Sequence, residues 1–211
     1  MMVTHADLAP HATFHANDMI VDGFGRAYVG NFGFDLHSFI NDRGEAALFE
    51  DPASLMTVLC LVHPGGRIEI VADELFFPNG TVITPDGSTL IIAETLGMRL
   101  TAFDIGADGS LSGRRLWADL SKEFIAPDGT CLDARGAVWV ANAVGAEAVR
   151  VGEGGEILQR VRTRRNCFAV ALGGPDGTTL FACTAETSDE TKAARSRTGA
   201  IEVATVDVAA A

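Results

Sequence analysis

The sequence predicts an all-β fold, a β-propeller with about four blades present in this chain. One pattern recurs four times: a polar residue, a short apolar strand, a turn and a second apolar strand. The clearest copy is PDGTCLDARGAVWVAN at residues 127–142, and the others begin at Asn17, Asn79 and Asn166. The copies are 62 residues apart from Asn17 to Asn79, and 49 from there to Asp128. All-strand repeats of about 40–50 residues are typical of propeller blades, each a four-stranded antiparallel sheet.

Each element follows from apolar runs separated by glycine-rich turns. An irregular leader is expected to about residue 13. The predicted strands, blade by blade, are 19–22, 26–30, 57–63 and 67–72; then 81–84, 89–93, 98–105 and 111–118; then 130–133, 137–141, 147–151 and 156–162; then 167–172, 179–184 and 201–208. The excursion at 34–55 is predicted to carry a loop or short helix over one face, and 186–198 to form an exposed insert. No composition shift divides the chain, so one domain is expected over 1–211.

Composition narrows the functional class. The chain has 211 residues and is 47% hydrophobic, which is enough for a core and excludes disorder. A net charge of −12 argues against a nucleic-acid partner. The apolar runs are too short to predict a membrane span. The start, MMVTHADLAPHA, lacks the features of a secretory signal, and the four cysteines form no CxxC pair. We therefore expect reduced, buried cysteines and a cytoplasmic protein.

Asn17, Asn79 and Asp128 occupy the same position in three repeats, at the entrance to a first strand. Equivalent positions of successive blades converge on the propeller axis, so the three side chains are expected to meet at one end of it. Three converging oxygens suit a hard divalent cation or a polar ligand. The alternative is that Asn and Asp favour turns before strands, Asp128-Gly129 being such a turn.

Other prominent side chains have structural or secondary roles in this scheme. Trp117 and Trp139 are predicted to pack inside blades. Phe32 and Phe34, just past a second strand, are candidates for shaping an apolar substrate pocket at the channel mouth. Glu94 follows an inner strand and is a further candidate for reaching the channel.

Three segments carry a resemblance to a known family: FHANDMIVDGFGRAYVGN, LFFPNGTVITPDGSTLIIAET and IAPDGTCLDARGAVWVAN. Together they resemble the regucalcin (senescence marker protein) and gluconolactonase family, from about Phe14 to the C-terminus. The resemblance implies a six-bladed propeller with one divalent cation in its channel and hydrolysis of lactones or esters. It implies that Asn79 and Asp128 bind the metal, that Asp128 also accepts and donates the proton, and that Asn17 contacts substrate near the metal.

The chain departs from the family pattern in three ways. His15 stands where sugar-binding members carry Arg, and Asp35 stands where they carry a longer acidic substrate contact. His15 and Asp35 are therefore candidate substrate-binding residues. The loss of Arg at His15 weakens the case for a sugar lactone, whereas Asp35 can still hydrogen-bond a hydroxyl, the alternative being a loop carboxylate in solvent. The remaining metal ligand of the family, a Glu in its first blade, has no counterpart before Asn17. The chain thus lacks about two blades, so it is a fragment, an arc completed by another chain, or a genuine four-bladed ring.

The function predicted by this resemblance is a metal-dependent hydrolase that opens a small lactone, a gluconolactonase-like enzyme. The alternative is a non-catalytic propeller that binds a cation or a metabolite, or an inactive fragment. The expected cofactor is one divalent cation: calcium, magnesium, manganese or zinc. With the N-terminal Glu absent, metal affinity is expected to be weak. The expected partner is a small lactone or ester, with self-association through exposed blade edges as a further possibility.

Overall fold

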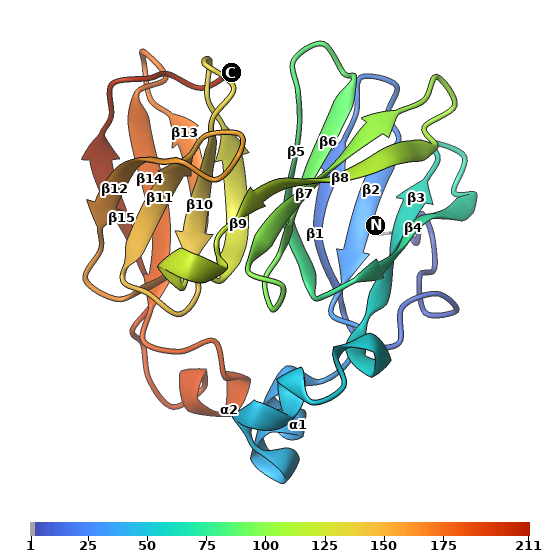
Figure 1. The fold of residues 1–211 in the computed structure, drawn as a ribbon, viewed down its shortest axis with the longest axis horizontal. Helices are drawn as coiled ribbons and strands as arrows, with labels where there is room; N and C mark the ends of the chain where they lie inside the picture. The colour runs from blue at the N-terminus through green and yellow to red at the C-terminus, as the bar shows by residue number, and fades with distance from the viewer. Residues whose placement is uncertain (1–2) are drawn as a thin grey trace.

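The computed structural model describes residues 3–211, which form four antiparallel sheets arranged as propeller blades (Figure 1). The first contains β1 (Ala16–Val21), β2 (Ala27–Asn31), β3 (Thr57–Val62) and β4 (Ile68–Leu75). The second contains β5 (Pro78–Ile83), β6 (Thr89–Glu94), β7 (Arg99–Ile105) and β8 (Leu111–Asp119). The third contains β9 (Pro127–Leu132), β10 (Val138–Asn142), β11 (Glu147–Val151) and β12 (Ile157–Arg162), and the fourth β13 (Asn166–Gly173), β14 (Thr179–Ala185) and β15 (Ala200–Thr205).

The predicted four-bladed arrangement is confirmed, and every predicted strand has a counterpart within a few residues. Within each sheet the strands follow in sequence order, and β1, β5, β9 and β13 are the first strands. Each first strand contacts the next one along the chain, β1 with β5, β5 with β9, and β9 with β13. These four strands are therefore the inner strands of the arc, and they bring their equivalent residues to the same region.

Apolar layers between neighbouring blades hold the arc together. Tyr28, Leu59 and Leu61 of the first blade pack against Leu90 and Ile92 of the second, and all five are fully buried. Comparable clusters join the second blade to the third and the third to the fourth. Burial of this kind is the main favourable term in folding, at about 25 cal/mol per Å² of apolar surface.

The two tryptophans lie in these layers. Trp117 belongs to the cluster between the second and third blades, and Trp139 to the cluster between the third and fourth. Both side chains are buried. The prediction that they serve core packing is confirmed.

The outer face of the fourth blade is apolar and exposed. Ile201 and Val203 of β15 are 70% and 65% exposed. They pair in register with Cys183 and Phe181 of β14, so the four side chains share one face. Cys183 is therefore exposed rather than buried as predicted, because no further blade covers this face among the described residues. The first blade also exposes apolar side chains, at Met19 and Val21.

Two excursions project from the end of the molecule at which the inner strands begin. The 34–55 segment carries α1 (Leu36–Arg43) and the short helices η1 (Glu45–Phe49) and η2 (Pro52–Leu55), and 186–198 carries α2 (Glu190–Ala193). A third short helix, η3 (Ser121–Glu123), precedes β9 at the same end. Figure 1 shows α1 and α2 side by side below the sheets, although they come from the first and fourth blades.

A contact between charges supports this proximity. The pKa of Asp189, the N-cap of α2, is lowered by a hydrogen bond from the Lys192 N–H and in part by the charge of His37 on α1. The predicted helical excursion and insert are thus confirmed. None of the helices described in residues 3–211 is long and apolar enough to cross a membrane.

Candidate metal and catalytic site

Each inner strand carries a β-bulge near its start, and the predicted site residues lie in these bulges. Between Ala16 and Met19, β1 uses one residue more than its partner strand, and the same shift occurs at Pro78–Thr81 in β5 and Pro127–Thr130 in β9. The bulged pairs are Asn17-Asp18, Asn79-Gly80 and Asp128-Gly129. Bulges re-aim side chains and are common next to active sites. The three polar residues therefore share their position in the repeats because each lies in the same kind of β-bulge.

The prediction that Asp128-Gly129 forms a turn before the strand is wrong, and the equivalent pair Asn79-Gly80 does not form a turn either. Both pairs lie inside strands, β9 and β5. The glycines serve close approach of neighbouring strands. A Cβ on Gly80 would lie 2.5 Å from the Thr130 N, and one on Gly129 would lie 2.8 Å from the Ala169 Cα. The glycine after each polar residue thus allows the inner strands to come together around the site.

Asn79 is held by a chain of buried hydrogen bonds between two blades. Its Nδ2 donates to Thr95 Oγ1 at 3.1 Å, and the Thr95 hydroxyl donates to the Pro127 carbonyl at 2.7 Å. Thr95 follows β6, while Pro127 immediately precedes Asp128. A single threonine therefore fixes the side chain of Asn79 relative to the backbone of Asp128.

Asp128 has the most perturbed carboxyl group of the cluster. Its pKa is raised to about 7, chiefly by burial and next by the charge of Asp18, while hydrogen bonds from Asn79 and the Gly129 N–H oppose the shift. Burial also raises the pKa of Asp18, although this residue keeps part of its surface exposed. Two carboxylates are thus brought together without a compensating cationic side chain among the causes of either shift.

Asp18 is the member of the cluster that sequence reasoning missed. The motif FHAND pointed to Asn17, and the adjacent carboxylate was not singled out. Successive residues of a regular strand face opposite sides. The bulge removes this alternation at residues 17 and 18. The sequence did contain a signal for Asp18, because a hard cation binds a carboxylate in preference to an amide.

Asn17 lies beside the start of the second blade. Its Nδ2 donates to the Pro78 carbonyl at 3.3 Å, one residue before Asn79. His15 lies two residues earlier, exposed, with its ring 4.0 Å from that of Phe14. The His15 carbonyl accepts the Phe32 N–H at 3.1 Å, which places Phe32 at the same end of the blade. Asn17 therefore lies in the bulge of β1, and His15 lies just before it.

Asp35 has a defined structural partner. It is the N-cap of α1, where Oδ1 accepts the Ser38 N–H at 3.0 Å and Oδ2 accepts the Ser38 hydroxyl at 2.7 Å. The hydrogen bond from the Ser38 backbone is the largest cause that lowers the pKa of Asp35. Its contact with substrate stays a prediction, since both of its oxygens already accept hydrogen bonds here.

Glu94 was a candidate for reaching the channel, but the structure places it elsewhere. It is fully buried within the second blade, where Arg99 donates to both of its oxygens, at 2.9 and 2.7 Å. Thr101 Oγ1 and the Phe76 N–H also donate to it. With four donors, this carboxylate is a structural group.

The chemical types of the donor atoms around Asp128 suit a hard divalent cation. Asp18 and Asp128 supply carboxylate oxygens and Asn79 an amide oxygen, which are the ligands that calcium, magnesium and manganese prefer. The mutual repulsion of the two carboxylates is what a cation would relieve. Within residues 3–211 no group of three His, Cys, Asp or Glu side chains is placed to hold a metal. The fit therefore rests on two carboxylates and an amide.

The antiparallel blades and the polar cluster at the start of the inner strands define a β-propeller with a candidate site at the axis. The family model described as the SMP-30/gluconolactonase/LRE-like region matches residues 2–186, so the chain belongs to this family. Regucalcin from Xenopus laevis is 28% identical over 176 residues, covering 80% of this chain and 54% of that protein. Regucalcin from Bos taurus is 28% identical over 172 residues, covering 78% and 52%. The chain thus spans about half the length of these relatives.

Solved structures agree with the fold. A luciferin-regenerating enzyme superposes with a TM-score of 0.77 at 19% identity, covering 98% of this chain and 66% of the other. A calcium-binding regucalcin from Agrobacterium tumefaciens gives 0.69 at 19% identity, covering 93% and 62%. A gluconolactonase from Xanthomonas campestris gives 0.60 at 24% identity, covering 80% and 54%. The family resemblance and the propeller fold expected from the motifs are confirmed.

Proposed function

We propose that this chain carries the catalytic carboxylate of a lactone-opening hydrolase that works with one divalent cation. The observation that supports this most is the pKa of Asp128, raised to about 7 in a cluster with Asp18 and Asn79. This value belongs to the protein without a cation, and it marks a buried pair of carboxylates whose repulsion a cation would relieve. A carboxylate at such a site can also exchange a proton with water as a general base. Membership of a family that includes gluconolactonases supports the lactone as substrate class.

In this proposal Asp128 moves one proton twice. It takes a proton from a water molecule whose oxygen attacks the lactone carbonyl carbon. The tetrahedral species then collapses, the bond from this carbon to the ring oxygen breaks, and Asp128 returns the proton to the departing oxygen. The product is an open-chain hydroxy acid. Asn17, in the bulge of β1 and next to the start of β5, has the role of orienting the substrate in this proposal.

Asn79 and Asp128 are the proposed cation ligands, and Asp18 is added to them because its charge acts on Asp128. A bound cation supplies charge stabilisation for the oxyanion that develops on the carbonyl oxygen. Calcium, magnesium and manganese suit oxygen donors, and zinc is retained as a candidate. Because only two carboxylates contribute, we expect a dissociation constant weaker than about 1 µM, as sites with few charged ligands bind weakly.

The test is hydrolysis of a panel of small lactones with each of the four cations and with EDTA. The proposal expects activity that EDTA abolishes and that Asp128→Asn lowers by about 100-fold or more, as is usual when a general base is lost. Asp86→Asn is the matched control, because Asp86 is exposed in the turn after β5, at the opposite end of the strand.

Cation binding without hydrolysis would instead favour a binding propeller. Calorimetric titration distinguishes the two, since Asp128→Asn then weakens cation binding with no activity to lose. Activity that persists in Asp128→Asn contradicts the proposal, provided that circular dichroism shows the variant to be folded.

A further inference from the structure

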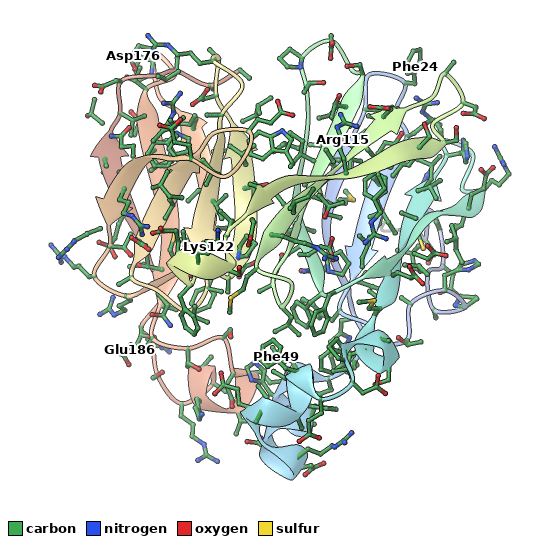
Figure 2. All side chains as sticks on the ribbon, viewed as in Figure 1. Phe24, Phe49, Arg115, Lys122, Asp176 and Glu186 are labelled. Atoms are coloured by element: carbon green, nitrogen blue, oxygen red, sulfur yellow. The ribbon has the colours of Figure 1, made fainter. Side chains whose placement is uncertain are left out.

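Phenylalanine is concentrated at the end of the molecule that carries the candidate site. Eight of the twelve phenylalanines lie in the segments that connect or precede strands at this end: Phe14, Phe32, Phe34, Phe39, Phe49, Phe76, Phe77 and Phe124. Phe24 lies in the turn between β1 and β2, at the other end. Figure 2 shows Phe24 and Phe49 at opposite ends of the molecule. Phe76 and Phe77 are buried, and Phe34 and Phe39 pack against the buried Leu48, Leu55 and Phe76, so part of this set forms the core beneath the helical excursion. Phe32 and Phe34 keep part of their surface exposed, and together with Phe77 they are called the aromatic wall. Apolar surface left exposed beside a polar cluster is typical of a binding site.

Two of these rings are tied directly to the site. Phe32 and Phe77 stack with their centroids 4.8 Å apart. Phe77 immediately precedes Pro78, whose carbonyl accepts the hydrogen bond from Asn17. The Phe77 carbonyl accepts a hydrogen bond from the N–H of Thr95, the residue that holds the side chain of Asn79. The stacked pair therefore lies next to both amide side chains of the cluster.

A third ring extends this wall towards the helical excursion. Phe34 meets Phe77 edge to face with centroids 5.9 Å apart, and meets Phe39 of α1 at 5.4 Å. Edge-to-face pairs at these distances are favourable. The rings thus run in series from the site to α1, and Phe32 and Phe34 keep part of their surface exposed.

The backbone of Phe77 is held in a costly conformation. Its φ of +61° is in the left-handed region, which a bulky side chain rarely adopts. Such a conformation costs roughly 1–3 kcal/mol and is found most often at ligand sites. Together with the ring contacts, this strained backbone indicates that Phe77 is held in its orientation for a function other than local stability.

Several polar groups at the same mouth are already engaged and cannot serve a polyhydroxylated ligand, although Asp18 and His15 remain accessible. Asp35 has both oxygens engaged with Ser38, and Asn17 and Asn79 donate to Pro78 and Thr95. A sugar needs a partner for each hydroxyl that it buries, because an unpaired polar group is expensive. An alkyl or aryl group needs only apolar surface.

From these observations we infer that the site takes a lactone bearing an apolar substituent, an alkyl or aryl group, which contacts the exposed parts of Phe32 and Phe34, while the buried Phe77 packs against both rings and supports them. This inference rests on the proposed lactonase function. The ring carbonyl faces Asp128 and the substituent lies along the aromatic wall. Recognition of sugar hydroxyl groups is not required, since selectivity comes from the substituent. Each methylene buried against the wall is expected to raise kcat/KM by about fourfold.

The experiment measures kcat/KM for δ-lactones whose alkyl substituent grows from methyl to hexyl, with glucono-1,5-lactone for comparison. The expected result is an increase with chain length and weak activity on the sugar lactone. Phe34→Ala is expected to remove most of the dependence on chain length, chiefly through KM. Phe34→Leu keeps an apolar side chain and should restore part of it. Phe24→Ala is the control, because Phe24 is 75% exposed at the opposite end.

Binding of the corresponding alkyl lactams, which resist hydrolysis, is measured in parallel by calorimetry. If no lactone is hydrolysed but lactam affinity still grows with chain length and Phe34→Ala abolishes this growth, the inference stands and the hydrolase proposal fails. If lactones are hydrolysed and the sugar lactone is preferred, or chain length has no effect, the hydrolase proposal stands and the inference is overturned. Absence of both hydrolysis and lactam binding also overturns it.

Discussion

The charge of Asp18 acts on Asp128 across the site, and together with burial it accounts for a carboxyl group whose pKa is about 7. Asp18 belongs to the first blade and Asp128 to the third, separated in sequence by the whole of the second. The two meet because bulges at the start of β1 and β9 aim both side chains towards the axis. Their repulsion stores free energy that a cation or a proton can release.

The stability of the protein without metal should depend on the protonation of Asp128. The folded pKa of about 7 lies above the ordinary value of 3.8, so folding favours the protonated form. This contribution is fully present below pH 3.8 and is lost as the pH rises through 7. The loss is on the order of 4 kcal/mol, since each unit of pKa difference is worth about 1.4 kcal/mol.

Asp128→Asn isolates this effect from other titrating groups. In EDTA at pH 8 the variant should be more stable than the wild type by a few kcal/mol, and the difference should vanish near pH 4. Urea unfolding at several pH values measures the free energy of unfolding of both proteins. Equal stability at pH 8 would show that Asp128 is ionised without cost, and that the two carboxylates do not repel each other in the folded state.

Gly80→Ala should destabilise the protein strongly. Its Cβ would lie 2.5 Å from the Thr130 N of the neighbouring inner strand, so β5 and β9 would have to separate. We expect a cost on the order of 3 kcal/mol, as for overpacking of a rigid core. Gly23→Ala is the control, because no atom lies within 4 Å of the added Cβ. Thermal unfolding of the two variants makes the comparison, and a similar midpoint for both would contradict the close packing.

Glu94→Gln should cost about 1.5–3 kcal/mol, because it removes the buried charged acceptor of Arg99, whose own side chain is 34% exposed. The ion pair of Asp104 with Arg115 lies in the same blade and is exposed. Asp104→Asn should therefore cost less than about 1 kcal/mol. Urea unfolding of both variants tests the contrast. A small effect at Glu94 would mean that the four donors around it are satisfied equally well by an amide.

Thr95→Val should weaken cation binding without touching a proposed ligand. The hydroxyl accepts from Asn79 and donates to the Pro127 carbonyl, so its loss frees the Asn79 side chain to rotate. We expect an affinity lower by about tenfold, within the range seen when a partner of a metal ligand is removed. Thr81→Val is matched, because the buried Thr81 hydroxyl donates to the backbone carbonyl of Asn79 and not to its side chain.

Calorimetric titration of calcium or manganese into both threonine variants reads out this prediction. The Thr95 variant should bind more weakly while the Thr81 variant keeps the wild-type affinity, even if both lose some stability. Equal affinities in the two variants would indicate that Thr95 supports the fold and does not position Asn79.

Much of the fold was predictable, because strand patterning and repeat spacing are local properties. The alternation and turn chemistry around residues 127–142 defined one blade, and its recurrence defined the others. The candidate residues Asn79 and Asp128 were found in the same way, from their equivalent positions. The turn predicted at Asp128-Gly129 was wrong, since the glycine is needed for contact with another strand rather than for a turn.

The sequence by itself determined the propeller class, the boundaries of the blades and the polar residues at the start of each inner strand. Only the tertiary structure decided that Asp18 joins Asp128, that Glu94 is bound by Arg99, and that Asp35 caps α1. The physical reason is the distance along the chain over which the interactions act. Strand and turn preferences act between near neighbours, whereas repulsion, burial and close approach depend on which distant segments the blades bring together.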